Sequence, residues 1–508
     1  MPHAEVLLLA LLLASPSPLA LSANVGPVPG PTRSLWLEGE ELQTYRSTPD
    51  LPPLSEVQDT IIIGAGIAGM SAAYGLTVLH NLNATVVDAR GVSGGATGRN
   101  SGGVGAEFDF AASAREWGKD RAKELQEFRS AAFEDLIEWV GAHCGSHCDL
   151  RVRGSVAMFL NRSAFQAAAA DVAVADRAGR GGNTTVWNGT ACATQLGSVP
   201  GDFEGCVASS FAGTIWASHF AVAVAKLALA TGRLNLQTET VVAEVRREAR
   251  REGSAKESND PTNRNDAPLW EVVTKGRGTM RARRVIFATN AWSSELLPEL
   301  RGEIVPVRGQ AMASFPLPQQ WHGYDLGCDV GDLYGHQQPE GNIVWGGFRR
   351  LAPDQQVGRV DDNGTDPLIS AALLSWLPEH FPALRGGGGS GSGGSGDSGD
   401  SGDSGGSGGS GGSVSSGSSG SSGGGEFRAA FEWSGLMGFT KDGLPWVGPL
   451  PSKGDGAYIV AGFNGGGVQD GWLMGRAVAT MIATGGKKPA FWENLDWFYD
   501  RYLPANKG

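Results

Sequence analysis

The segment from Thr60 to Asp88 constrains the fold more than any other part of this 508-residue chain. A β-branched run, Thr60–Ile63, leads directly into the turn GAGIAG at residues 64–69, and a helix-like segment follows. A second apolar run, Ala84–Val87, then ends in Asp88. This order of strand, glycine turn, helix, strand and acid is typical of a parallel α/β unit that binds a dinucleotide.

Each part of the turn has a separate physical task. Gly64 permits the tight turn, Gly66 lets the backbone approach a pyrophosphate, and Gly69 lets the helix lie close to the strand. The helix N-terminus offers amides and a partial positive charge to the phosphates. Asp88 can accept hydrogen bonds from a ribose hydroxyl group. A glycine-rich turn in an unrelated domain is the alternative, and it would not require an acid at this spacing.

The residues after Asp88 indicate which dinucleotide binds. Arg90 is followed by GGATGRN at residues 94–100, where paired glycines and small side chains leave room for a cofactor close to the backbone. This segment resembles the arginine and paired-glycine motif that follows the second strand in FAD-binding oxidoreductases. A surface glycine loop is the alternative.

Further segments extend the resemblance along the chain. Val285–Trp292 resembles the returning strand of an FAD-binding domain, and Pro306–Gln310 resembles the family's entry into a substrate domain. Trp433–Pro445 resembles the segment that lies along the flavin, and Gly462–Gly467 resembles the loop that meets the flavin ring. Between residues 50 and 490 the chain thus resembles the superfamily of D-amino-acid oxidase, glycine oxidase and sarcosine oxidase.

The resemblance implies a non-covalent FAD, because the cysteine that tethers flavin in sarcosine oxidases would fall at Gly435. A helix N-terminus near the flavin would stabilise the negative charge of the reduced ring. The residues expected to bind FAD are Gly64, Gly66, Ile67, Ala68, Gly69, Asp88, Ala89, Arg90, Gly95, Ala96, Thr97, Arg99, Asn100, Val242, Ala288, Thr289, Asn290, Gly462, Asn464, Gly465, Gly466 and Gly467.

The implied fold class is α/β (α+β overall), with a Rossmann-like FAD-binding domain beside a second, mostly antiparallel β-sheet domain that covers the flavin. The predicted FAD-binding domain is discontinuous, and the substrate domain is inserted in it. A polar, proline-containing lead is expected at residues 24–57. The FAD-binding domain would comprise residues 58–150, 205–304 and 427–508, and the substrate domain residues 151–204 and 305–385.

Apolar spacing predicts further elements. Residues 111–140 carry apolar side chains at helical spacing, and residues 151–160 read as a strand. Residues 161–210 are alanine-rich and then loop-like. A helix is expected over residues 219–230, followed by one strand-like run over residues 234–245.

The family's chemistry implies oxidation of a C–N bond of an amine or amino acid by hydride transfer to flavin. Oxygen is the expected acceptor, giving hydrogen peroxide. Because the cofactor carries the difficult step, a dedicated acid or base is not required. The alternatives are a dehydrogenase that passes electrons to a partner or quinone, and a flavin-binding protein without turnover.

The carboxylate-binding residues of the family are absent from their expected places. The arginine of glycine and D-amino-acid oxidases would fall at Met437, and the lysine of sarcosine oxidases would fall at Gln469. These absences favour amines or secondary amino acids as substrates. The remaining candidates for substrate contact are Tyr334, His336 and Arg349, with packing or solvation as the alternative for each.

Composition excludes some classes of protein. The net charge is -12, and no basic stripe with interleaved aromatics is present, so nucleic-acid binding is not expected. The apolar run Val6–Ala14 is too short to span a bilayer and predicts a signal peptide over residues 1–23, with no membrane span in the mature chain. We expect the secretory pathway or an extracellular location; a signal anchor, an organelle presequence and a cytosolic chain are the alternatives.

Two further features leave alternatives open. Residues 386–426 are almost purely Gly and Ser, and we expect a disordered surface loop there. Cys144 with Cys148 and Cys192 with Cys206 could form disulfides, leaving Cys328, or remain buried thiols. No metal is expected, because the histidines and cysteines at residues 143–148 lack a second ligand cluster.

Overall fold

The computed structural model describes residues 26–39, 41–105, 110–179, 183–248, 269–321, 324–330, 332–385, 427–489, 492 and 503–504. The predicted signal peptide and the Gly/Ser loop lie outside these residues. Within them, no helix is both long enough and apolar enough to cross a membrane.

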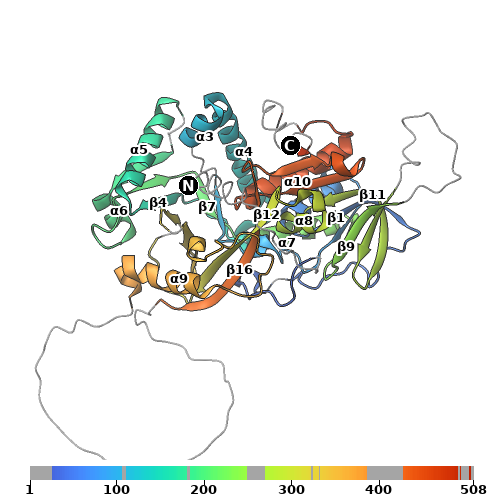
Figure 1. The fold of residues 1–508 in the computed structure, drawn as a ribbon, viewed down its shortest axis with the longest axis horizontal. Helices are drawn as coiled ribbons and strands as arrows, with labels where there is room; N and C mark the ends of the chain where they lie inside the picture. The colour runs from blue at the N-terminus through green and yellow to red at the C-terminus, as the bar shows by residue number, and fades with distance from the viewer. Residues whose placement is uncertain are drawn as a thin grey trace, which may run out of the picture.

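The first sheet has a parallel centre in the order β18, β11, β1, β2 and β8. Antiparallel strands extend it, because β17 pairs with β18, β10 with β11 and β9 with β10. Figure 1 shows this sheet on the right of the molecule. Its strands are β1 (Val57–Ile63), β2 (Ala84–Val87), β8 (Leu234–Gln237), β9 (Val242–Arg247), β10 (Trp270–Thr274), β11 (Gly278–Phe287), β17 (Trp446–Pro449) and β18 (Ala457–Ala461).

The glycine turn connects β1 to α2 (Ile67–Tyr74), whose eight residues are all buried. This helix packs between α7 (Ala217–Ala230) and α10 (Gly467–Thr484). Its small side chains permit that position, since Gly475 of α10 lies against its backbone with no room for a side chain. The longer α4 (Lys119–His143), preceded by α3 (Phe110–Trp117), buries the apolar positions that its spacing predicted.

The second sheet has the order β16, β12, β15, β14, β13, β4, β6 and β5, and all its pairs are antiparallel except β4 with β13. Leu373, Trp376 and Leu377 of α9 (Pro367–His380) pack into its core. The predicted second, mostly antiparallel sheet is therefore confirmed. Its strands are β4 (Ser155–Phe159), β5 (Thr184–Asn188), β6 (Gly205–Ser209), β12 (Ile304–Ser314), β13 (Asp325–Cys328), β14 (Leu333–Gln337), β15 (Ile343–Gly346) and β16 (Ala429–Thr440).

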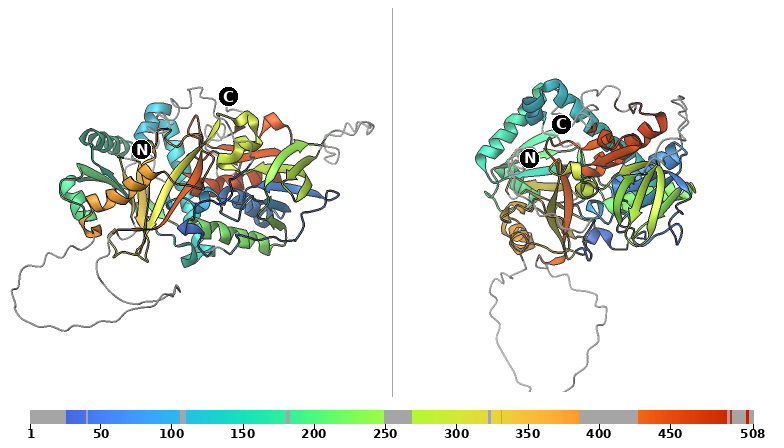
Figure 2. Two further views of the ribbon diagram at one scale, coloured as in Figure 1. Left: turned by 60° about the horizontal axis from the view of Figure 1, so that its bottom comes forward. Right: turned by 45° about the vertical axis from the view of Figure 1, so that its right-hand side comes forward.

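The two sheets lie side by side, and the long pair β12 and β16 runs along their junction in both views of Figure 2. A small third sheet pairs β3 (Gly103–Gly105) with β7 (Ala212–Thr214). Two predicted domain boundaries need correction, because β6 and β16 belong to the second sheet. β16 pairs with β12, and β6 pairs with β4 and β5, so both strands lie in the second sheet.

Two predictions of secondary structure were wrong. The alanine-rich start of residues 161–210 forms α5 (Arg162–Arg177), and the part after it is not loop-like, because it contains β5, α6 (Gly189–Leu196) and β6. Asn161 caps α5, and its side chain accepts hydrogen bonds from the amides of Ser163 and Ala164. The run over residues 234–245 is two strands, β8 and β9, separated by a turn in which Glu239 has a φ of 51°.

The N-terminal residues 26–38 are not a detached lead. Trp36, 1% exposed, packs in a core with Trp433 and Val344, and its indole N–H donates to the Asn100 carbonyl at 2.6 Å. The Ser34 hydroxyl donates to the Gly98 carbonyl at 2.7 Å. This segment therefore braces the predicted cofactor loop at residues 94–100.

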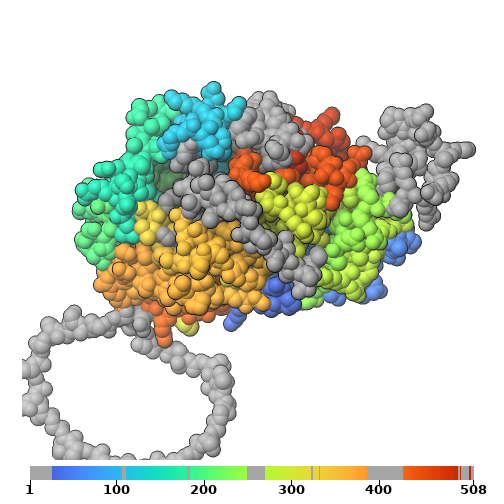
Figure 3. Space-filling view, viewed as in Figure 1, coloured from blue at the N-terminus to red at the C-terminus, as the bar shows by residue number. Residues whose placement is uncertain are grey.

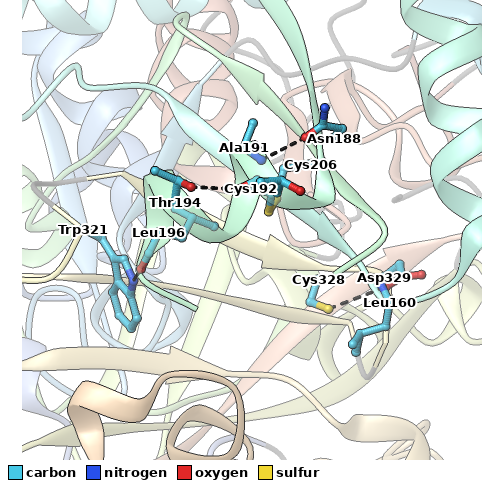
Figure 4. Close-up of a disulfide and its surroundings, with 11 residues drawn as sticks. Leu160, Asn188, Ala191, Cys192, Thr194, Leu196, Cys206, Trp321, Cys328 and Asp329 are labelled. Atoms are coloured by element: carbon cyan, nitrogen blue, oxygen red, sulfur yellow. Dashed lines mark hydrogen bonds between the residues drawn. A yellow bond between two sulfur atoms is a disulfide. The ribbon is translucent and has the colours of Figure 1, made fainter. Parts of the chain in front are cut away.

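The sequence left open whether the cysteines form disulfides or remain thiols, and the structure contains both. Disulfides join Cys144 to Cys148 and Cys192 to Cys206, and Cys328 is a buried thiol. Figure 4 shows the second disulfide beside α6, with Cys328 on the neighbouring β13. Burial raises the pKa of Cys328 to about 12, so this thiol stays protonated at neutral pH. In the part of the chain that is described, no group of His, Cys, Asp and Glu is arranged to hold a metal ion.

Candidate functional site

A cavity of about 550 Å³ lies between the two sheets. All the predicted FAD-binding residues except Gly69 and Gly462 line it. Tyr334 and Arg349 line the same cavity from the second sheet. On the face shown in Figure 3, the second sheet and its helices (blue-green and orange) and the first sheet (yellow-green) form the two sides of the molecule.

The glycine turn has the geometry that its sequence predicts. Gly64 has a φ of +113°, and a Cβ at Gly69 would collide with the Gly64 carbonyl oxygen. Gly69 therefore acts through helix packing, which explains why it does not line the cavity. The amide of Ile67, at the start of α2, donates to the Thr97 hydroxyl at 3.0 Å. This contact joins the turn to the second predicted cofactor segment.

Asp88 lies at the end of β2 beside the glycine turn. Its two carboxylate oxygens accept hydrogen bonds from the amides of Ala65 at 2.6 Å and Arg90 at 2.7 Å. Burial raises the pKa of Asp88, while the two amides and Arg90 act in the opposite direction. A carboxylate has about four acceptor positions, so Asp88 keeps capacity for a ribose hydroxyl group.

An ion-pair network holds the cofactor loop against the loop that connects η8 to α9. Arg90 donates from both terminal nitrogens to Asp362, each at 2.7 Å, and Arg99 lies 3.8 Å from the same carboxylate. Asp362 is fully buried. Burial lowers the pKa of Arg99 to about 10, and Asp362 opposes this shift, so Arg99 remains a cation at neutral pH. No motif in the sequence pointed to Asp362, which lies in a loop 272 residues from Arg90.

The loop before α10 forms the wall where the flavin ring is expected. The side-chain oxygen of Asn464 accepts a hydrogen bond from the amide of Thr440 at 2.8 Å. The side-chain oxygen of Asn290 accepts one from the amide of Gly462 at 3.0 Å. Gly462 thus anchors the loop from behind and does not line the cavity. Beyond it, a Cβ at Gly466 would have only the Phe463 carbonyl within 4 Å, which leaves space at the cavity surface.

The substrate side of the cavity is built by the second sheet. Tyr334 lies on β14, and Arg349 begins the short helix η8 (Arg349–Leu351) after β15. The Arg349 guanidinium lies over the Phe439 ring at 5.8 Å from its centroid. Met437, where the family's arginine is absent, lines the same region. Arg349 therefore brings a guanidinium into the cavity from a different element.

The prediction that His336 contacts substrate needs correction, because this residue does not line the cavity. It is 2% exposed and packs behind the wall, with its ring against Gly102 and 6.0 Å from the Trp36 ring. Burial lowers the pKa of His336 to about 3, so its imidazole is neutral at physiological pH. Tyr334, two residues away, lies on the same face but nearer the cavity.

Three polar residues of the cavity were not predicted: Arg129 of α4, Asp325 of β13 and Asp332. Asp332 forms an ion pair with Arg350 at 2.8 Å. These three belong to no short motif, so only the folded chain brings them together. Gln469 of α10, at the position of the family's lysine, also lines the cavity and donates to the Gly105 carbonyl at 2.9 Å.

The cavity fits FAD on its own geometry. It joins a glycine turn without side chains, a carboxylate at the ribose position and an open glycine wall before α10. The residues that would hold the pyrophosphate, the ribose and the flavin ring thus follow one another along a single space.

Comparison with solved structures supports the same fold. The chain is similar to L-proline dehydrogenase from P. horikoshii, with 17% identity, a TM-score of 0.63, and coverage of 88% of this chain and 97% of that one. Glycine oxidase from Geobacillus kaustophilus has 18% identity, a TM-score of 0.62, and coverage of 87% and 97%. Iminodiacetate oxidase from Chelativorans sp. BNC1 has 17% identity, a TM-score of 0.60, and coverage of 88% and 98%.

No curated protein sequence matches the chain. The family model described as FAD dependent oxidoreductase matches residues 59–418, which is more than half of the chain. This span includes the glycine turn, Asp88 and the cofactor loop, and it reaches into the second sheet. The protein therefore belongs to the FAD dependent oxidoreductase family and is an FAD-binding enzyme.

Proposed function

We propose that this enzyme oxidises the C–N bond of an amino acid and that the carboxylate of this substrate binds at Arg349 and Tyr334. Oxygen then reoxidises the flavin. The observation that carries the proposal is the single cavity that joins the GAGIAG turn to Arg349. An arginine fork binds both oxygens of a carboxylate, and a tyrosine hydroxyl can add a third hydrogen bond.

The position of Arg349 changes the expectation drawn from the sequence. The absence of the family's arginine at Met437 favours amines or secondary amino acids. A guanidinium that reaches the same cavity from η8 can serve the same purpose, so the proposal favours amino acids. The structural neighbours named above include both a dehydrogenase and oxidases, so they leave the electron acceptor open.

The chain's own residues have distinct tasks in this proposal. Gly66 and the first turn of α2 bind the pyrophosphate, and Asp88 binds the ribose. When bound, FAD supplies a ring that accepts a hydride from the carbon beside the amine nitrogen. The N-terminus of α10 lies where its partial positive charge would favour an electron-rich ring. Tyr334 and Arg349 orient the substrate and exclude water from its carboxylate.

The test is an anaerobic titration of the FAD-loaded protein, followed by its visible spectrum. Pooled amino acids should bleach the oxidised flavin bands, and pooled amines without a carboxylate should not. Admission of air should restore the bands within the mixing time if oxygen is the acceptor. Slow restoration in air, with fast restoration by a quinone, would favour the dehydrogenase alternative. Flavin that no pool bleaches would contradict the proposal and favour a protein without turnover.

A further inference from the structure

Asp325 is a carboxylate of the cavity wall that neither the motifs nor the proposed function uses. It begins β13, where its amide donates to the Gly154 carbonyl at 3.1 Å and so fixes its place in the sheet. Its side chain lies against Gly103, where an added Cβ would be 2.7 Å from Asp325 Oδ2. Gly103 lies three residues after the end of the cofactor loop, so this carboxylate lies on the side of the substrate region that is nearer the cofactor.

The sheet register relates Asp325 to the substrate residues. Asp325 is paired with His336, and Gly327 is paired with Tyr334. Residues directly opposite each other, and residues two positions apart on one strand, share a face of the sheet. Asp325 and Tyr334 are therefore diagonal neighbours on the cavity face. Arg349 follows β15, which pairs with β14 on the side away from β13, so Tyr334 lies between Asp325 and Arg349.

The other carboxylates that line the described part of the cavity have different positions. Asp88 accepts backbone amides beside the glycine turn, and Glu295 lies near Trp292 at the cofactor end. Asp332 is ion-paired with Arg350 at 2.8 Å, near the proposed carboxylate site. Asp325 is the one that combines a place beside the cofactor loop with a place beside Tyr334.

We propose that Asp325 binds the protonated amino group of the substrate, so that the site selects amino acids with an unblocked, cationic nitrogen. This inference rests on the proposed oxidation of amino acids. A zwitterion held by Arg349 at its carboxylate and by Asp325 at its nitrogen would have its C–N bond toward the flavin side of the cavity. The bound ammonium loses one proton, which the Asp325 carboxylate accepts, and the neutral amine then loses a hydride from its α-carbon to the flavin and becomes a cationic iminium. The nitrogen is therefore cationic in the form that binds and in the product. An N-acylated amino acid offers no such charge.

The experiment compares two probes that differ only in the amino group. 2-Aminoisobutyrate has no hydrogen on its α-carbon and isobutyrate has no amine, so neither can be oxidised. Each is titrated into the FAD-loaded full chain, and its dissociation constant is measured from the shift of the flavin absorption bands. The wild-type protein should bind 2-aminoisobutyrate about ten- to a hundredfold more tightly than isobutyrate, the range for a hydrogen bond between charged groups.

The variant Asp325→Asn should lose this preference by weakening only 2-aminoisobutyrate, and Asp325→Glu should restore part of it. Asp332→Asn is the matched control, because it removes another carboxylate of the same cavity and should keep the preference. The visible spectrum of bound FAD and the melting temperature verify that each variant is folded.

Equal or absent binding of the two probes by the wild type, or an unchanged preference in Asp325→Asn, would overturn the inference. The proposed function fails by a different result, since it requires bleaching of the flavin by amino acids. Bleaching with an unchanged preference in Asp325→Asn would therefore reject the role of Asp325 alone.

Discussion

The two halves of the cavity are specified in different ways. The cofactor half is made largely of backbone from short motifs: the glycine turn, the loop at residues 94–100, which the Ile67–Thr97 contact joins to it, and the glycine loop before α10. The substrate half is made of side chains such as Asp325 of β13, Tyr334 of β14 and Arg349 of η8. The motifs of the first half can each be recognised in a short stretch of sequence, whereas the second half exists only after distant strands have paired.

Asp362 provides the severest test of this division, because it joins the two halves. We expect Asp362→Asn to lower the free energy of unfolding by about 3–5 kcal/mol, since it leaves Arg90 and Arg99 buried without their anion. Urea denaturation measures this loss, and a titration with FAD should show weaker binding. Glu204, 33% exposed and paired with Arg162, which is 73% exposed, is the control, and Glu204→Gln should cost only about 1 kcal/mol. Equal losses for the two variants would show that the network does not join the halves.

Substitutions at two glycines of the cofactor half should have different effects, one on stability and the other on cofactor binding. Gly69→Ala places a methyl group against the Gly64 carbonyl, so we expect a loss of about 3 kcal/mol in unfolding free energy. Gly466→Ala places it in open space at the cavity surface, so stability should be kept while FAD binds less tightly. Thermal melts without FAD, together with FAD titrations, distinguish the two effects. Equal melting temperatures for both variants would contradict the packing role of Gly69.

The same contrast explains how much the sequence could predict. The strand, turn, helix and acid around Gly64 follow from local conformation, and the family resemblance extended them to both sheets and to FAD. Asp362, Asp325 and Arg129 carry no local signal, because their importance comes from partners far away in the chain. Tyr334 and His336 were both candidates for substrate contact, and the sequence could not show that His336 packs behind the wall against Gly102 while Tyr334 lines the cavity.

Arg349 tests the substrate half directly. Arg349→Lys keeps the charge but loses the planar fork, so we expect KM for the best amino acid to rise about tenfold, or about 1.4 kcal/mol, with FAD binding unchanged. Arg350 is the adjacent control, since it is 40% exposed and paired with Asp332. Steady-state kinetics for Arg349→Lys and Arg350→Lys would decide the matter. A larger effect for Arg350→Lys would move the carboxylate site away from Arg349.

His336 has the smallest expected effect at neutral pH, and it tests where the substrate half of the cavity ends. Burial lowers its pKa to about 3, whereas an unfolded histidine titrates near 6.5, so the unfolded chain binds more protons between these values. His336 should therefore reduce stability as pH falls below about 6.5, by up to about 1.4 kcal/mol per pH unit. Glutamine does not titrate, so His336→Gln should be less sensitive to acid than the wild type when urea denaturation is compared from pH 7 to pH 4. The raised pKa values of Asp88 and Asp470 act in both proteins and cancel in the difference. Because the ring lies behind the wall, KM should stay unchanged in this variant, and a large rise in KM would return His336 to the substrate site.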